Sequence, residues 1–281
     1  MNNDPALSAK NVMPEHDISL PKLSELGSDL LHITKFQLIA TLVLPFLCTA
    51  LYFVFAFLGY WPLAVLALMY LSFVTYGSIS HDLLHRNLGL SQRTNDVFFS
   101  IIELIAIRSA HAYRVVHLHH HRRFPHDDDI EGAASKLNLI RTLLEGTTLQ
   151  FRIFVWALKR AKSERVWIVL EGVGCALILI AALLLYPRTP IPLVYVVLMV
   201  MGSWIIPLIT SYIPHNPNGT DELSRTRLYR GVVASAIAME HLYHLEHHLF
   251  PAVPHHNWPR LAKRLDPYFE KKGIRPVVIW F

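Results

Sequence analysis

Four long apolar stretches dominate this sequence and restrict the folds open to it. They cover residues 36–58, 61–80, 166–186 and 191–213. The first contains 23 residues and no charged side chain. At about 1.5 Å per residue, a helix of that length spans roughly 35 Å, enough to cross the hydrocarbon core of a bilayer. The breaks at Gly59-Tyr60 and at YPRTP are too short to hold a domain. We therefore predict an all-α integral membrane protein with four transmembrane helices in two hairpins.

The distribution of basic residues predicts an orientation. Lys and Arg total 26, and all but Arg188 lie in residues 1–35, in residues 81–165 or after residue 213. Since loops rich in Lys and Arg remain in the cytoplasm, that side is predicted to be cytoplasmic and to carry both termini. We expect residues 1–35 to form an N-terminal cytoplasmic segment, loosely ordered or lying on a surface. Residues 36–281 are expected to form the membrane domain with a cytoplasmic helical cap.

A shorter apolar segment, Val97–Ile107, has 11 residues. This length is too short to span a membrane, so we expect an interfacial or re-entrant helix. Glu171 stands alone as a charged residue within the third long stretch. A carboxylate is costly in lipid, and its side chain should therefore face other helices or a cavity, without a catalytic role. Cys48 and Cys175 are interpreted as small buried apolar residues.

Histidine is unusually abundant, with 17 residues, most of them in three short windows. The windows are HDLLH with His81 and His85, HLHHH with His117, His120 and His121, and HLEHH with His244, His247 and His248. Offsets of three and four place side chains on one face of a helix, where they can share a metal ion. His119 would point to another face.

These windows favour a site for two metal ions. Neutral imidazole binds iron, zinc, copper and nickel. One zinc ion needs only about three or four protein ligands, so eight well-spaced histidines suit two ions better than one. Alone, the first window would also fit interfacial histidines at the lipid headgroups, and the second would also fit a basic surface patch with Arg122 and Arg123. Two histidine-bound metals beside a bilayer favour redox chemistry on an apolar substrate over hydrolysis.

Other polar residues near the windows have weaker signals. Asp127, Asp128 and Asp129 could hold the free N–H groups of ligating imidazoles, although a solvated acidic loop would have the same sequence. Four histidines could lie near the metals without binding them: His111, His119, His126 and His241. Four more are expected to be structural: His16, His32, His255 and His256.

The three windows resemble the histidine boxes of the membrane fatty acid desaturase superfamily, which read HxxxH, HxxHH and HxxHH. The last box is commonly followed by an apolar segment with proline, as in HLEHHLFPAVP here. The resemblance covers about residues 60–265. It implies a mushroom-shaped four-helix membrane domain, a cytoplasmic cap and a di-iron centre bound by the eight histidines. Structurally known relatives have a further histidine after the fourth membrane helix, and His215 in SYIPHNPN is the match.

The spacing of the first box narrows the resemblance. HxxxH fits acyl-lipid desaturases, and carotenoid ketolases and hydroxylases, better than the acyl-CoA delta-9 branch, which has HxxxxH. The resemblance therefore implies an oxygen-dependent desaturase that introduces a double bond into a lipid acyl chain, with two iron ions as cofactors and O2 as co-substrate. The same site would suit a lipid hydroxylase or a carotenoid hydroxylase or ketolase.

The partners expected are a lipid acyl substrate, the membrane and an external electron donor of the ferredoxin or cytochrome type. No reductase motif is visible, and neither HExxH, GxGxxG nor GxSxG occurs. The basic excess fits membrane topology and anionic headgroups rather than nucleic acid. A rival of another class is a histidine-rich metal transporter, which predicts polar residues along the crossings. Only Glu171 is a charged residue within the predicted crossings.

Overall fold

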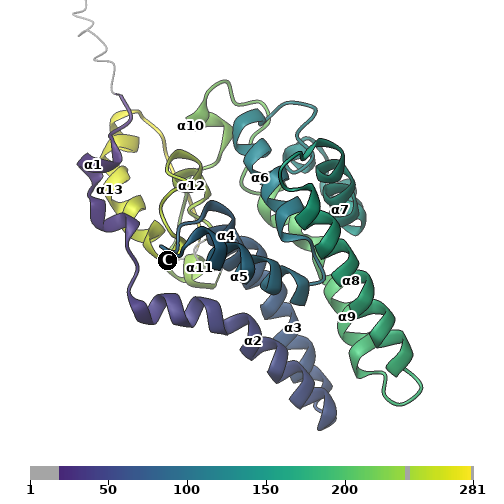
Figure 1. Cartoon of the computed structure of the whole chain (residues 1–281). Coiled ribbons are helices and arrows are strands. Elements are labelled where there is room, and N and C mark those ends of the chain that lie inside the picture. Colours follow the sequence, from purple (N-terminus) through teal and green to yellow (C-terminus); the bar gives the residue numbers. More distant parts are fainter. Residues whose placement is uncertain (1–18, 238–240, 280–281) are drawn as a thin grey trace, which may run out of the picture.

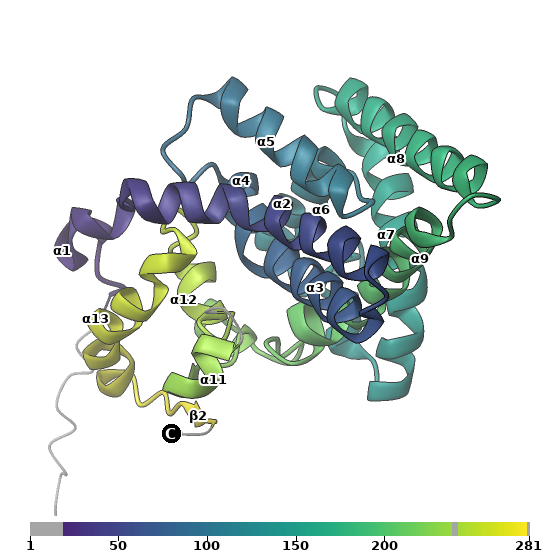
Figure 2. The ribbon, with the colours of Figure 1, turned by 90° about the horizontal axis from the view of Figure 1, so that it is seen from below.

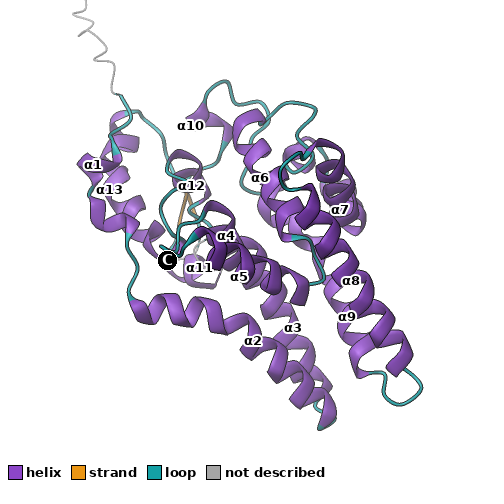
Figure 3. Cartoon of the chain, in the orientation of Figure 1, coloured by secondary structure: helices purple, strands orange, loops and turns teal. Residues whose placement is uncertain are grey.

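The protein is described by a computed structural model that covers residues 19–237 and 241–279. This part of the chain is mostly helical (Figure 3), and its only sheet is a parallel pair of two-residue strands, β1 (Tyr229–Arg230) and β2 (Val277–Val278). Of the predicted N-terminal segment, residues 1–18 lie outside the described residues. Within residues 19–34, Leu30 is fully buried, and Asn257 donates hydrogen bonds to the carbonyls of Leu30 and His32 at 2.9 Å.

Four helical segments are long and apolar enough to cross a membrane: Ser28–Phe57, Trp61–His85, Arg165–Leu185 and Ile191–Tyr212. They contain α2 (Lys35–Phe57), then α3 (Trp61–Val74) with α4 (Ser80–His85), then α8 (Arg165–Leu185), and finally α9 (Ile191–Gly202). Large apolar side chains cover their outer surfaces; Phe57 and Leu184, for example, are 83% and 76% exposed. Such surfaces are stable in lipid and costly in water.

The boundaries of these helices follow from local chemistry. α2 begins with a capping box, in which Thr34 Oγ1 accepts from the Gln37 N–H and Gln37 Oε1 accepts from the Thr34 N–H. It ends at Phe57, and the chain then turns at Gly59, whose φ of 80° is a left-handed conformation that glycine adopts without strain. α2 and α3 then run side by side, as do α8 and α9 after the turn at 186–190 (Figures 1 and 2).

The remaining helices lie mainly at the end of the bundle opposite the turns that join α2 to α3 and α8 to α9 (Figure 1). They are α1 (Leu23–Leu26), α5 (Gln92–Ile105), α6 (Ala110–Arg123), α7 (Leu139–Arg160), α10 (Glu222–Arg225), α11 (Val232–Ile237), α12 (His244–Leu249) and α13 (Trp258–Lys271). Short 3-10 helices are η1 (Ser28–Leu31), η3 (Gly132–Lys136), η4 (Ser203–Ile205) and η6 (His255–Asn257), and short π-helical segments are η2 (Thr75–Ile79) and η5 (Leu208–Tyr212). The short apolar segment 97–107 is largely helical, as predicted, and lies mostly in α5. α7 was not predicted as a separate helix; it buries Leu149 and Ile153 but leaves the apolar Phe151 71% exposed.

Glu171 faces protein, which confirms that prediction. Its side chain is 2% exposed and lies on α8. One carboxylate oxygen accepts from Ser100 Oγ at 2.6 Å and from His111 Nδ1 at 2.6 Å. The other accepts from Ser109 Oγ at 2.7 Å and from the His111 N–H at 3.1 Å. The carboxylate therefore fastens α5 and the start of α6 to α8.

Replacing Glu171 by alanine should destabilise the protein without removing metal. The change leaves the buried donors of Ser100 and His111 without their acceptor, and each unsatisfied buried group costs about 1–3 kcal/mol. We expect the thermal unfolding midpoint in detergent to fall by several degrees. Glu145→Ala is the control, since Glu145 is a partly exposed residue of α7 that pairs with Arg152. Equal midpoints for the two variants would contradict the fastening role.

Candidate metal centre

The nine predicted ligands come from four places in the fold. α3 continues through η2 into α4, so His81 and His85 lie in the last part of a segment that is long and apolar enough to cross a membrane. α6 carries the second box, and α12 carries the third. His215 follows η5 at the end of the fourth candidate span. Residues far apart in sequence are thus brought to one end of the bundle.

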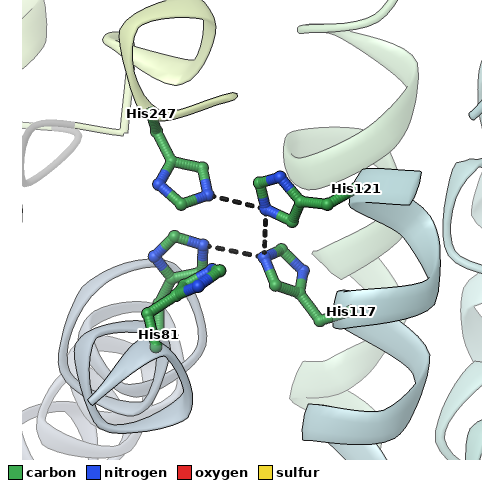
Figure 4. A group of neighbouring side chains, drawn as sticks. His81, His117, His121 and His247 are labelled. Atoms are coloured by element: carbon green, nitrogen blue, oxygen red, sulfur yellow. Dashed lines mark hydrogen bonds between the residues drawn. The ribbon is translucent and has the colours of Figure 1, made fainter. Parts of the chain in front are cut away.

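The first group consists of five histidines whose ligand nitrogens all lie within 4.8 Å of one another: His81, His85, His117, His121 and His247. Nε2 of His117 lies 3.0 Å from Nε2 of both His81 and His121. Nε2 of His247 lies 2.8 Å from Nε2 of His121. Figure 4 shows these rings converging from α4, α6 and α12.

The second group consists of four histidines with the same property: His120, His215, His244 and His248. Nε2 of His215 lies 3.1 Å from Nε2 of His120, 3.1 Å from that of His248 and 3.3 Å from that of His244. The structure therefore brings all nine predicted residues together, but it divides each of the last two boxes between the groups. His117 and His121 face one group, and the intervening His120 faces the other.

Burial keeps most of these imidazoles neutral. For His117, His121, His215, His244, His247 and His248, loss of solvation lowers the pKa well below its usual value, and the positive charge that neighbouring imidazoles would carry lowers it further. His120 differs: burial opposes its charge, but the carboxylates of Asp129 and Glu131 together outweigh burial and raise its pKa. Neutral imidazole is the form that binds a metal.

Two carboxylates hold ligating rings in place from behind. Asp129 Oδ2 accepts from His120 Nδ1 at 2.8 Å, and its other oxygen accepts from the N–H groups of Glu131 and Gly132. Glu131 accepts from His117 Nδ1 at 3.1 Å, and burial raises the pKa of this carboxyl to about 7. Donation from Nδ1 leaves the Nε2 lone pair free and aims it at the group.

The distances within the second group show whether its imidazole nitrogens fit a metal ion. His215 Nδ1 donates to the Ser211 carbonyl at 3.2 Å, so its Nε2 presents a single lone pair. That one lone pair faces three other Nε2 atoms at 3.1–3.3 Å. One lone pair makes one good hydrogen bond, whereas a cation shared by four imidazoles accounts for all the contacts. The donors thus fit a metal ion such as iron in each group.

Several sequence interpretations change at this site. Among the three aspartates, Asp129 contacts a ligand ring, whereas Asp128 pairs with His119, which points away from the groups as predicted. His111 contacts Glu171 and not the histidine groups. Glu131 was not among the predicted site residues, and its only signal in the sequence is its place in the acidic run DDDIE.

The first box also has a support that its sequence did not predict. His255, expected to be merely structural, donates from Nδ1 to Asp82 Oδ2 at 2.6 Å, and its N–H donates to Asp82 Oδ1 at 3.1 Å. Asp82 is fully buried and lies between the two histidines of HDLLH. This contact ties α4 to η6 across 173 residues of sequence.

Fold and site together define a class: a helical membrane protein with two buried groups of histidines able to bind metal ions. The sequence profile of the fatty acid desaturase family matches residues 55–280. The chain therefore belongs to the fatty acid desaturase family, as the histidine boxes indicated. A search of curated proteins returned no matching relative.

Proposed function

We propose that this protein is an oxygen-dependent di-iron desaturase that introduces a double bond into a lipid acyl chain. The observation that carries the proposal is the convergence of nine imidazole nitrogens into groups of five and four at the end of a bundle of apolar helices. The first group would hold one iron ion and the second group the other. Membership of the fatty acid desaturase family supports iron and a lipid substrate.

The chemistry would consume O2 and two electrons. When bound, the irons would supply the oxidising power by which two neighbouring methylenes each lose one hydrogen atom, while O2 takes up four electrons and four protons in total and leaves as two waters. The protein's own residues orient the ligand rings and enclose the site. Asp129 and Glu131 fix the tautomers of His120 and His117. The fully buried Trp258 packs against the ring of His247 at 5.2 Å and keeps water from that side.

The membrane arrangement follows as part of the same proposal. Segments 36–58 and 61–80 would form one hairpin and segments 166–186 and 191–213 the second, within a membrane domain of residues 36–281. The histidine groups, the cap and both termini, including the N-terminal segment 1–35, would lie on the cytoplasmic side. The support is that Arg188 is the one basic residue assigned to the opposite side.

Product analysis tests the reaction. The gene would be expressed in a host of defined lipids, with and without carotenoids, and the lipids analysed by mass spectrometry. New unsaturated methyl esters are the expected product. Hydroxylated esters would contradict desaturation in favour of a lipid hydroxylase, and modified carotenoids would do so in favour of a carotenoid hydroxylase or ketolase. If the purified protein contained other metals and formed no oxidised product, the alternative of a histidine-rich metal transporter would be favoured.

The electron donor is proposed to be a small acidic redox protein of the ferredoxin or cytochrome type. Arg122 and Arg123 are exposed at the end of α6, directly after the second box. Attraction between opposite charges accelerates docking and is screened by salt. We expect turnover with such a donor to fall as salt approaches about 1 M, where the Debye length is about 3 Å. A small uncharged reductant is the control and should show no salt effect; equal salt dependence with both would contradict docking by charge.

A further inference from the structure

A cavity of about 680 Å³ lies between α3 and α9, beside the histidine groups but not formed by them. Pockets that bind small organic molecules usually measure roughly 300–1,000 Å³. Its walls are almost entirely hydrocarbon, from residues such as Leu68, Met69, Leu198 and Ile206. A polar or charged ligand would find few partners there, whereas an alkyl chain would lose little by leaving lipid.

The cavity opens sideways, towards the surface that lipid would cover. On its outer side, Met69 and Met201 are 63% and 62% exposed. On its inner side, Leu68 and Tyr76 are 3% and 2% exposed. Both walls belong to segments able to span a membrane. A lipid tail could therefore enter from the bilayer without passing through water.

The inner end of the cavity adjoins both histidine groups. His241 lines it, and its ring lies 5.2 Å from the ring of His244 in the second group. Tyr76 also lines it, and its hydroxyl donates to Glu131 Oε1 at 3.4 Å, which in turn holds His117 of the first group. Gly77 completes this end, where an added Cβ would lie 3.1 Å from His241 Nδ1.

We infer that this cavity binds one hydrocarbon tail of a membrane lipid, which enters sideways between α3 and α9. The inference rests on the proposed function. The end at Gly77 lies near the metals, and the end at Val65 lies deeper along α3, about 18 Å away at 1.5 Å per residue. A lipid of the adjoining leaflet already points its methyl end towards the bilayer centre. The methyl end therefore lies towards Val65 and Leu198, and the reacting methylenes lie beside His241.

Gly202 provides a means to test the length of the cavity. It lines the cavity on α9, and a Cβ added there would have Ser72 Oγ as its nearest neighbour, at an ordinary contact distance of 3.6 Å. The helix thus tolerates a side chain at this position, and a larger one would project into the cavity. Val200 on the same helix is 54% exposed and does not line the cavity, so Val200→Leu is the matched control.

The experiment compares wild type, Gly202→Leu and Val200→Leu, each loaded with iron, in vesicles of phosphatidylcholine whose tails differ in length. In Gly202→Leu, turnover of the longest accepted tail relative to the shortest should fall by about 10-fold or more, because excluding a single methylene from an apolar pocket has an effect of that size. Val200→Leu should match wild type. Gly202→Ala, a smaller change that favours the helix, should show a weaker effect in the same direction.

A second readout is independent of activity. Phosphatidylcholine with a photoreactive diazirine on one tail should cross-link to residues of α3 and α9 that line the cavity, and Gly202→Leu should reduce that cross-linking with iron content unchanged. Cross-links elsewhere, or an unchanged length preference in Gly202→Leu, would overturn the inference. Absence of any oxidised lipid from the wild type would instead refute the proposed function, and the cross-links would still decide the cavity.

Discussion

Replacing His247 by alanine should abolish turnover and remove the iron ion of the first group. His247 is fully buried on α12, and its Nε2 lies 2.8 Å from that of His121. It is the one residue of the third box in the first group, so its loss disconnects α12 from that group. We expect bound iron to fall from about two ions per chain towards one, because metal affinity depends on the full ligand set. Iron content and product formation measure the two effects.

His119→Ala is the matched control for His247→Ala. His119 lies on α6 within the second box, but its ring packs against Trp156 and pairs with Asp128. This variant should keep its iron and its activity. The helical content and elution volume of both variants should equal those of wild type. A His247→Ala protein with two irons and wild-type turnover would show that this residue is not a ligand.

Replacing Asp129 by asparagine should weaken iron binding by about 10- to 100-fold, the usual effect of removing a group that orients a ligand. Asp129 holds His120 through a charged hydrogen bond of 2.8 Å, and its other oxygen is fixed by two backbone N–H groups. The neutral amide is a weaker acceptor and cannot support the same charge on the ring. Turnover at limiting iron should fall in proportion, and excess iron should restore part of it.

Asp128→Asn serves as the control for Asp129→Asn. Asp128 is the adjacent residue in the sequence, is partly exposed and contacts His119 and Arg123 rather than a ligand. We expect wild-type iron affinity for it. If Asp128→Asn and Asp129→Asn bound iron equally well, the support of His120 by Asp129 would have no role in metal binding.

Local periodicity is the part of this site that the sequence revealed directly. His81 and His85, like His244 and His248, are four residues apart, and each pair shares a group. That relation depends only on the helix pitch, which is the same in every α-helix. The four apolar stretches were predictable for a similar reason, since spanning a bilayer requires a fixed length of apolar helix.

The partition between the two groups was not predictable in this way. His120 and His121 are adjacent in sequence but belong to different groups. Neighbouring residues of a helix point about 100° apart, so α6 directs one of these rings to each group. Which group each ring joins depends on where α4, α12 and η5 sit around α6. The contact of Asp82 with His255, and that of Glu131 with His117, likewise depend on tertiary packing.

The most direct test of the central claim is a crystal structure of the iron-loaded protein with anomalous diffraction measured at the iron absorption edge. The claim predicts two iron peaks, one among His81, His85, His117, His121 and His247, and the other among His120, His215, His244 and His248. A single peak, or iron bound away from these nine imidazoles, would contradict it.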